Sequence, residues 1–197
     1  MIPARGGSKG IPAKNLQAVG GLSLVARSVQ AALASRGVER VVVSTDDDAI
    51  AAEAQAHGAD VVRRPADLSG DTASSESALL HALETLDKQG PLPARVVFLQ
   101  CTSPFTSGAQ IDQVLAALED PAINSAFAVA PWHGFLWRLD GRGINHDPQQ
   151  PRQRRQDLEP AFLETGAIYA MTTAAFRASG SRFCAPWQPV VINDSGP

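Results

Sequence analysis

Short apolar runs alternate along this chain with longer segments of helical periodicity, and this alternation is the strongest constraint on its fold. In residues 22–33 the apolar side chains fall on one face at helical spacing, Gly37 ends the pattern, and residues 40–44 form an apolar run typical of a buried strand. Repetition of this order predicts helices at residues 22–33, 49–57, 74–86 and 111–118, and strands at residues 40–44, 59–62, 95–100, 125–130 and 167–171. The pattern predicts a three-layer α/β/α fold, with a mainly parallel, Rossmann-like sheet between helices.

Polar segments that follow the predicted strands indicate where a ligand would bind. In sheets of this kind, ligands bind beyond the carboxyl ends of the strands. Residues 44–46, the loop after Val62 and residues 100–103 each follow a predicted strand. We expect these segments and the glycine-rich opening of the chain to converge on one crevice.

Residues 2–15 combine glycine with positive charge, as a phosphate-binding loop does. Three glycines let the backbone turn and bring its N–H groups close to a ligand, and three cations supply charge for a polyanion. These residues are Gly6, Gly7, Gly10, Arg5, Lys9 and Lys14. Their spacing matches neither G-x-x-x-x-G-K-[ST] nor G-x-G-x-x-G, so the mechanisms of those motifs do not transfer. The alternative is a flexible basic terminus, which the apolar helical pattern that follows disfavours.

Composition favours one soluble domain over residues 1–197. Of the 197 residues, 44% are hydrophobic and 19% charged, and the net charge of −3 provides no field to attract nucleic acid. No apolar run approaches the ~20 residues of a membrane span, and the start lacks the apolar core of a signal peptide. We therefore expect a cytoplasmic protein without a membrane partner. Cys101 and Cys184 predict reduced thiols, and Cys101 is expected to be a packing residue rather than a nucleophile.

The regular alternation fails between Trp132 and Pro160. This stretch contains aromatic residues such as Trp137 and a run rich in Gln, Arg and Pro. Aromatic residues and a dense arginine cluster indicate packing or ligand contact rather than a plain linker. We interpret residues 132–160 as an excursion from the sheet and not as a separate domain.

Four stretches of the chain carry a resemblance to a known family. They are Arg5-Gly-Gly-Ser-Lys-Gly-Ile-Pro12 with Lys14-Asn15, residues 64–75, Leu99-Gln-Cys-Thr-Ser-Pro104, and residues 152–157 followed by residues 164–169. On these residues the chain resembles the CMP-sialic acid synthetases, also called acylneuraminate cytidylyltransferases. The matches span nearly the whole chain in the family's order.

This resemblance implies a fold of the nucleotide-diphospho-sugar transferase type and a specific reaction. CMP would be transferred from CTP to the anomeric hydroxyl of a sialic acid-like nonulosonic acid, an acidic nine-carbon sugar, with release of pyrophosphate. It also implies Mg²⁺ as the divalent cation, and a homodimer in which residues 132–160 reach across the interface.

Residue chemistry and the resemblance together give a candidate site. Cations suit a triphosphate, arginine and serine can donate to the carbonyl and ring nitrogen of cytosine, and an Arg/Gln cluster can clamp a sugar carboxylate. The nucleotide-binding candidates are Ala4, Arg5, Gly6, Ser8, Lys9, Lys14, Asn15, Arg64, Ala73 and Ser75. The sugar-binding candidates are Gln100, Thr102, Arg154, Arg155, Gln156 and Tyr169. Catalytic roles are assigned to Arg5, Lys9, Lys14 and Gln100.

Structural roles stay open for several of these residues. The lysines could be solvated, Asn15 could cap a turn, and residues 152–157 could be an exposed charged segment. Ser74, beside the base-reading candidates, could serve only as a helix N-cap. Tyr169 lies in an apolar strand and could be a core residue with its hydroxyl satisfied. Arg63, next to Arg64, is expected to face solvent.

The chain departs from the family pattern in several places. Thr165 stands where the family usually has Asn, Cys101 where it has Pro, and Thr106 where an Arg is expected. These positions bear on the sugar, so its identity is left unassigned. The family's Asp-x-Asp magnesium ligands fall near Pro197, so we expect the metal pair beyond that residue and a domain truncated at both ends.

Two functions therefore remain open. The first is an active cytidylyltransferase; the second is a non-catalytic or truncated CTP-binding domain that lacks the metal carboxylates. Transfer to a ketodeoxyoctulosonate is less favoured, because that branch lacks Gly-Gly-Ser-Lys-Gly in its opening loop.

Overall fold

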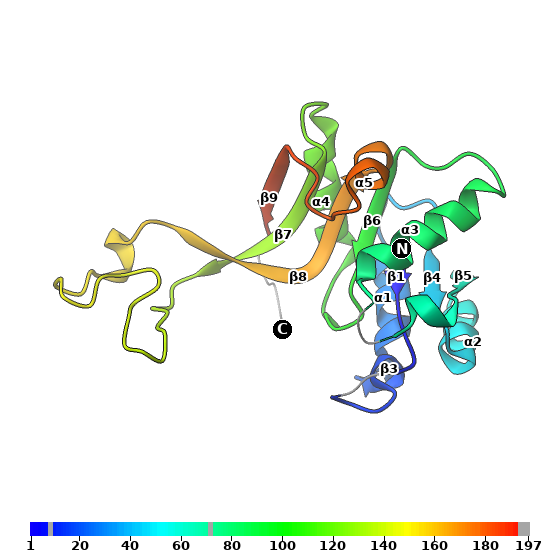
Figure 1. Ribbon diagram of the computed structural model, residues 1–197, viewed down its shortest axis with the longest axis horizontal. Helices are drawn as coiled ribbons and strands as arrows, with labels where there is room; N and C mark the ends of the chain where they lie inside the picture. Colours follow the sequence, from blue (N-terminus) through cyan, green and yellow to red (C-terminus); the bar gives the residue numbers. More distant parts are fainter. Residues whose placement is uncertain (8–9, 71–72, 193–197) are drawn as a thin grey trace.

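The computed structural model describes residues 1–7, 10–70 and 73–192, and a sheet with helices on both faces lies at its centre (Figure 1). One part of the sheet has the order β1-β4-β5, paired in parallel throughout. Its strands are β1 (Ile2–Pro3), β4 (Val42–Thr45) and β5 (Asp60–Arg63). The other part has the order β6-β8-β7-β9. Its strands are β6 (Arg95–Leu99), β7 (Ser125–Trp132), β8 (Ala161–Thr172) and β9 (Trp187–Val191).

Met1 joins the two parts of the sheet. Its carbonyl accepts a hydrogen bond from the Leu99 N–H at 3.1 Å, and its amino group donates to the Val97 carbonyl at 2.6 Å. The strand β1 therefore lies between β4 and β6, and these seven strands follow the order β5-β4-β1-β6-β8-β7-β9. Only β8, among them, runs antiparallel to its neighbours. The prediction of a mainly parallel sheet is confirmed.

The helices cover the sheet in two layers because successive strand residues face opposite sides. They are α1 (Leu24–Leu33), α2 (Asp48–Ala56), α3 (Ser75–Asp87), α4 (Gly108–Ala116) and α5 (Thr173–Ser179). On one side, α1, α2 and α4 share a core with Leu99 and Ala170. On the other side, α3 and α5 share a core with Phe98 and Met171. The three-layer α/β/α prediction is therefore confirmed.

Most predicted elements are present within a few residues of their expected bounds, but the start of the first helix was wrong. Residues 18–23 form an antiparallel hairpin of β2 (Ala18–Val19) and β3 (Leu22–Ser23). Helix α1 begins only at Leu24, because the Ser23 hydroxyl accepts from the Ala26 N–H and caps it. Neither α5 nor β9 was predicted.

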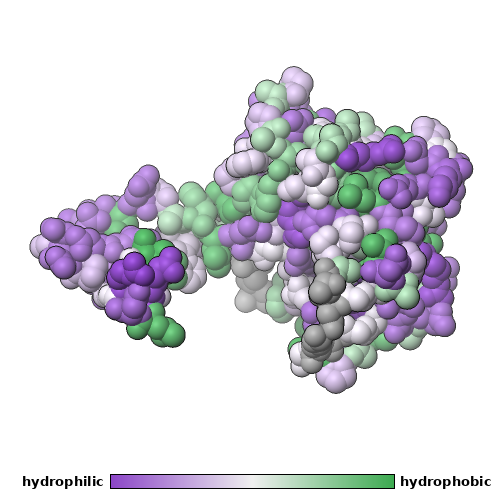
Figure 2. Space-filling model, in the orientation of Figure 1, coloured by the Kyte–Doolittle hydropathy of each residue, from purple (hydrophilic) through white to green (hydrophobic). Residues whose placement is uncertain are grey.

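Residues 133–160 leave the sheet, as expected. Strand β7 ends at Trp132 and β8 begins at Ala161, and the paired ends of these two strands carry the intervening segment away from the sheet (Figure 1). Apolar side chains remain exposed along this projection, which Figure 2 shows as a narrow extension with green areas among purple ones. None of the described helices is long and apolar enough to cross a membrane.

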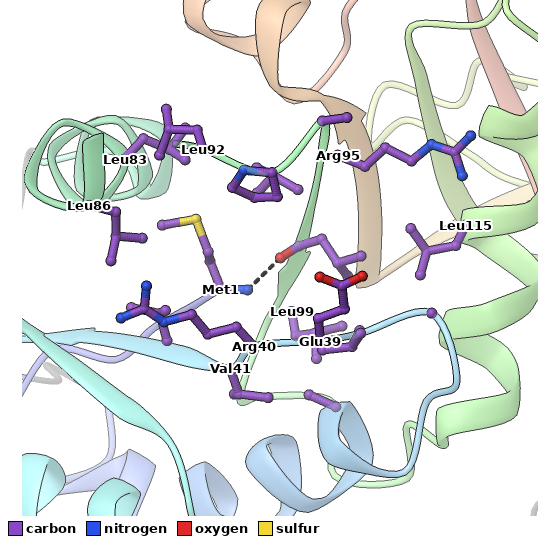
Figure 3. Close-up of a pocket in the computed structure, with 18 of the residues that line it drawn as sticks. Met1, Glu39, Arg40, Val41, Leu83, Leu86, Leu92, Arg95, Leu99 and Leu115 are labelled. Carbon is purple, nitrogen blue, oxygen red and sulfur yellow. Dashed lines mark hydrogen bonds between the residues drawn. The ribbon is translucent and has the colours of Figure 1, made fainter. Parts of the chain in front are cut away.

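A cavity of about 990 Å³ lies at the amino ends of β4 and β6, beside Met1 (Figure 3). Apolar groups such as Val41 and Leu86 line it together with Glu39, Arg40 and Arg95. The cavity lies between β4 and β6, next to the start of β1. It is therefore at the opposite end of the sheet from the carboxyl ends of the parallel strands. Burial lowers the pKa of the Met1 amino group from 8.0 to about 5.

For a chain that begins at Met1, we predict that the Met1 amino group makes stability depend on pH. Between pH 5 and 8 the unfolded chain keeps this amine protonated while the folded chain holds it neutral, so stability rises with pH across that window and falls on acidification. The expected loss is roughly 2–4 kcal/mol, measured as unfolding free energy at pH 8 and pH 5.5.

An extension of Val-Ile-Val ahead of Met1 isolates this effect, because it moves the amine out of the cavity while Glu39, Arg40 and Arg95 remain. Its apolar side chains should raise Tm and remove most of the acid sensitivity, whereas a Gly-Ser-Gly extension should raise Tm less. An acid sensitivity equal in the parent and the Val-Ile-Val protein would contradict the assignment to Met1.

Candidate functional site

The opening loop is fixed against the residues that follow β4. The Ala4 N–H donates to the Ser44 carbonyl at 2.9 Å and continues the β1–β4 pairing. The next turn is held by the Gly6 N–H, which donates to Asp46 Oδ1 at 3.1 Å. A Cβ atom on Gly6 would lie 2.6 Å from Asp47 Oδ2, so this close approach of two loops requires glycine. Asp46 was not predicted to hold the loop.

Arg5 and Asn15 give the loop its further fixed contacts. Arg5 Nη1 donates to the Gly70 carbonyl at 2.9 Å, which ties the opening loop to the segment ahead of α3. Asn15 is buried, and its Nδ2 donates to the Arg5 carbonyl at 2.9 Å. The described bond of Asn15 is therefore one that shapes the loop backbone. The predicted site residues Ser8 and Lys9 lie outside the described part of the chain.

Arg64 lies directly after β5 with only 8% of its surface exposed. Its Nη2 donates to the Ser44 carbonyl at 2.6 Å and its Nε to Ser44 Oγ at 3.3 Å, so these two bonds use two of its five N–H groups. Burial lowers the pKa of the Arg64 guanidinium; the charge of Asp46 opposes this effect and that of Arg5 adds to it. The charges of Arg64 and Arg5 therefore act on one another, and an anion near both would relieve this repulsion. Arg63 is exposed and pairs with Asp48, as predicted for a solvated neighbour.

The start of α3 completes the nucleotide side of the crevice. The Ser74 hydroxyl accepts from the Ser77 N–H at 3.0 Å, which confirms Ser74 as the helix N-cap. The Ala73 N–H donates at 3.1 Å to the carbonyl of Gly70, the residue that Arg5 also contacts. The predicted base-reading positions Ala73 and Ser75 thus lie next to the segment that binds Arg5.

Lys14 lies in the opening loop, and its charge acts on Cys101 in the loop after β6. It is the first residue of a 3-10 helix, η1 (Lys14–Leu16). Burial raises the pKa of the Cys101 thiol to about 11, and a hydrogen bond to Ser28 and the charge of Lys14 act against this rise. Lys14 is thus close enough to influence residue 101. A buried thiol that stays protonated at neutral pH is a packing group, so the prediction for Cys101 is confirmed.

Gln100 and Tyr169 come together on the other side of β1. The Gln100 N–H donates to the Ala167 carbonyl at 3.2 Å, and Tyr169 pairs with Phe98 across β6 and β8. Only 2% of Tyr169 is exposed, and its hydroxyl donates to Glu164. Burial and this bond raise the pKa of Tyr169 to about 12. In this conformation Tyr169 is a core residue whose hydroxyl is satisfied, while Thr102 is exposed at the surface.

The arginine-rich run does not join the crevice within one chain. Arg154 and Gln156 are exposed in the projecting segment, and Arg154 Nε donates to Asp157 at 2.8 Å (Figure 1). The side chain of Arg155 lies outside the described part of the structure. These predicted sugar-binding residues are therefore separated from Gln100.

Two further charged residues near Gln100 were missed by the sequence interpretation. Arg182, before β9, and Glu76, in the first turn of α3, form a half-buried ion pair beside Gln100. Glu76 looks like an ordinary acidic residue at a helix start, and Arg182 stands alone in a loop. Neither has a local signal that could have indicated the other.

The described residues do not themselves provide a magnesium site. Among them there is no group of three or more His, Cys, Asp or Glu side chains that could hold a metal ion.

A loop of backbone N–H groups and cations at the carboxyl end of a mainly parallel sheet defines a nucleotide-binding α/β protein. A family model described as "Cytidylyltransferase" matches residues 1–135. A pseudaminic acid cytidylyltransferase of Campylobacter jejuni is 32% identical over 182 residues, which cover 89% of this chain and 78% of that protein. The chain belongs to the cytidylyltransferase family.

Other relatives confirm the resemblance to the CMP-sialic acid synthetases. A CMP-N,N'-diacetyllegionaminic acid synthase of Legionella pneumophila is 30% identical over 202 residues, 98% of this chain and 85% of that protein. An N-acylneuraminate cytidylyltransferase of Oncorhynchus mykiss is 34% identical over 181 residues, 88% of this chain and 41% of that protein. The chain spans about two fifths of the length of this and two similar vertebrate relatives.

Two solved structures share the fold. A CMP:2-keto-3-deoxy-manno-octonic acid synthetase complexed with CTP matches with a TM-score of 0.71 at 19% identity, over 100% of this chain and 90% of that one. A 4-diphosphocytidyl-2C-methyl-D-erythritol synthase from Anaerococcus prevotii matches with a TM-score of 0.66 at 13% identity, over 100% and 88%. Both support the α/β architecture.

We predict separate effects of the cations and of Arg64 on nucleotide binding. Arg5→Ala and Lys14→Ala should each weaken binding of CTP, ATP and GTP alike by about 2–4 kcal/mol, because each removes a charge-assisted phosphate contact. Arg64→Met should abolish the preference for CTP over the purine nucleotides. The measurement is Kd by calorimetry, supported by the ligand-induced rise in Tm.

Arg63→Ala is the matched control, because Arg63 is exposed beside Arg64. This variant should bind all three nucleotides with the affinities of the parent. If CTP, ATP and GTP raise the Tm of the parent equally, the prediction of cytosine selection is wrong, but the prediction of a phosphate-binding loop is not affected. If Arg5→Ala and Lys14→Ala bind like the parent, the loop assignment is wrong.

Proposed function

We propose that this chain is a nucleotidyltransferase that transfers CMP from CTP to the anomeric hydroxyl of a sialic acid-like nonulosonic acid. The hydroxyl oxygen attacks the α-phosphorus, the bond to the bridging oxygen of the β-phosphate breaks, and pyrophosphate leaves as the hydroxyl proton is released. The observation that carries the proposal is the placement of Arg5, Arg64 and Gln100 along one end of the sheet. The reactions named for the relatives support the same assignment.

The residues divide between the two substrates. In the proposal, Arg5, Lys9 and Lys14 bind the triphosphate and stabilise the charge that develops on pyrophosphate. Arg64, with Ala73 and Ser75 at the start of α3, selects cytosine. Gln100 and Thr102 lie across β1 from these residues and would hold the sugar so that its hydroxyl meets the α-phosphorus.

Mg²⁺ is part of the proposal as the partner of the triphosphate, where it would offset phosphate charge. We assign none of its ligands to the described residues. The alternative of a CTP-binding domain without transfer is not favoured, because the matched relatives carry the names of transferases and synthases. The proposed place of action is the cytoplasm, where CTP is available.

The projecting segment supports a homodimer as a further part of the proposal. The exposed apolar side chains of this segment and of the adjoining end of β8 are Leu136, Trp137, Leu139, Ile144, Phe162 and Leu163. Exposed apolar side chains that gather on one projection are typical of a protein–protein interface. A second copy that packed on it could bring three residues of one protomer, Arg154, Arg155 and Gln156, to Gln100 of its partner.

The transfer reaction is tested by pyrophosphate release from CTP with N-acetylneuraminic, legionaminic and pseudaminic acids as acceptors. Release should require an acceptor and Mg²⁺, and should vanish with the 2-O-methyl glycoside of N-acetylneuraminic acid, which lacks the attacking hydroxyl. If protein that binds CTP releases no pyrophosphate with any of the three acids, the transferase proposal is wrong and the alternative of a CTP-binding domain is favoured.

The dimer is tested by sedimentation of the parent and of Trp137→Glu/Leu139→Glu. We expect the parent to sediment at twice its chain mass of 20.7 kDa and the variant at that mass, because charges in the apolar surface oppose its burial. Leu33→Glu, a change of an exposed leucine on α1, is the control and should stay dimeric. A monomeric parent would contradict the dimer.

A further inference from the structure

An ion pair beside Gln100 joins the start of α3 to the loop before β9. Arg182 Nε donates to Glu76 Oε1 at 2.6 Å, and the two side chains are only 17% and 19% exposed. Glu76 is the second residue of α3, directly after Ser75. Arg182 comes from the loop between α5 and β9. The pair therefore connects the helix that begins at a nucleotide-binding candidate with the surroundings of a sugar-binding candidate.

Two aromatic rings lie against the Arg182 guanidinium. Its central carbon lies 4.7 Å from the ring centroid of Phe98 and 4.7 Å from that of Tyr169, and these rings stack on each other at 5.3 Å. Burial alone would lower the pKa of Arg182 and raise that of Glu76, but their hydrogen bond and mutual attraction outweigh it and shift both in the opposite direction. The charge of Arg182 is thus already paired with Glu76, so Arg182 is less suited to bind an anionic ligand.

Arg182 also determines how the Gln100 amide is oriented. In the orientation that satisfies both neighbours, the Gln100 oxygen accepts from Arg182 Nη1 at 3.2 Å and its nitrogen donates to the Gly166 carbonyl at 3.1 Å. The reverse orientation sets two donors against each other and retains only a 3.5 Å contact from the Thr102 hydroxyl. Because a guanidinium cannot accept a hydrogen bond, we assign the first orientation.

This orientation specifies what Gln100 can recognise. Its oxygen is held by Arg182, one N–H is held by Gly166, and the nitrogen lies on the side of exposed Thr102. The second N–H is the group left to meet a ligand, so Gln100 suits an oxygen that accepts, such as a carboxylate, an acyl carbonyl or a hydroxyl oxygen.

On the basis of the proposed function, we infer that Arg182 is a positioning residue for the acceptor sugar: it holds Gln100 as a hydrogen-bond donor, and Glu76 holds Arg182 in place. The pair also ties this orientation to the start of α3, so the donor and the cytosine-selecting residues share one rigid frame. Arg182 itself touches neither the triphosphate nor the reacting atoms in this assignment.

The kinetic test uses Arg182→Met/Glu76→Gln, which removes both charges together and leaves no unpaired carboxylate. With the second N–H of Gln100 no longer directed, KM for the sugar should rise on the order of tenfold while KM for CTP stays within about twofold. Arg182→Lys keeps the charge but lacks the planar fork, so it should retain the parent Tm and still raise KM for the sugar.

Arg177→Met/Asp87→Asn is the matched control. It removes an exposed ion pair of 3.1 Å at the far end of α3 and should leave both KM values unchanged. An equal rise in both KM values for the Arg182 variants, or no rise in either, would overturn the positioning role, because the first indicates general damage and the second no contribution.

A second measurement does not depend on turnover. The side-chain amide protons of Gln100, identified in the NMR spectrum by their loss in Gln100→Glu, should be dispersed and slow to exchange in the parent and in the control. In Arg182→Met/Glu76→Gln they should move to the position of a solvated amide. An unchanged pair of resonances overturns the inference. Absence of pyrophosphate release from the parent refutes the proposed function instead, and the amide resonances still decide whether Arg182 orients Gln100.

Discussion

The arrangement of this protein depends on the backbone hydrogen bonds that a very short central strand makes to both sides. Met1 bonds to Val97 and Leu99 of β6, and Ala4 bonds to Ser44 of β4. Among the described residues, these backbone hydrogen bonds join the parallel strands β4 and β5 to the other part of the sheet, in addition to the core that both parts share. The opening loop starts where β1 ends, so the same few residues that join the sheet also set the position of the cations. Stability and ligand binding are therefore coupled at this point.

The loop after β1 is kept in place by a carboxylate rather than by a ligand. Asp46 accepts from the Gly6 N–H and also favours the charged form of buried Arg64. The negative charge of Asp46 would weaken the attraction of these cations for phosphate, but it offsets the repulsion between Arg5 and Arg64. The charge of Asp46 thus stabilises a fold in which Arg5 and Arg64 lie close enough to affect one another.

The sequence predicted those parts of the molecule whose signal is local. Period and capping located α2 and α3, and the failure of the alternation located the projecting segment between Trp132 and Ala161. Strand β9 was missed because four of its five residues are exposed and it contains Pro189, so it lacks the alternation of a half-buried strand. Arg5, Arg64 and Gln100 could be proposed as site residues because each stands in a recognisable motif. Arg182 was not, because its partner Glu76 is 106 residues away and only the tertiary structure brings them together.

Three arginines illustrate why residue type alone does not assign a role in this site. Arg154 lies in solvent with Asp157, where screening makes the pair weak and easily exchanged for another partner. Arg64 is buried, and burial lowers its pKa, so an anion that entered the crevice would relieve an existing cost. Arg182 is enclosed by Glu76 and two aromatic rings, so an anion would gain little from it. The burial of each guanidinium and the groups that it already contacts therefore suit the three arginines to different roles. Arg154 can exchange one partner for another, Arg64 is suited to bind an anion, and Arg182 is suited to position a neighbour.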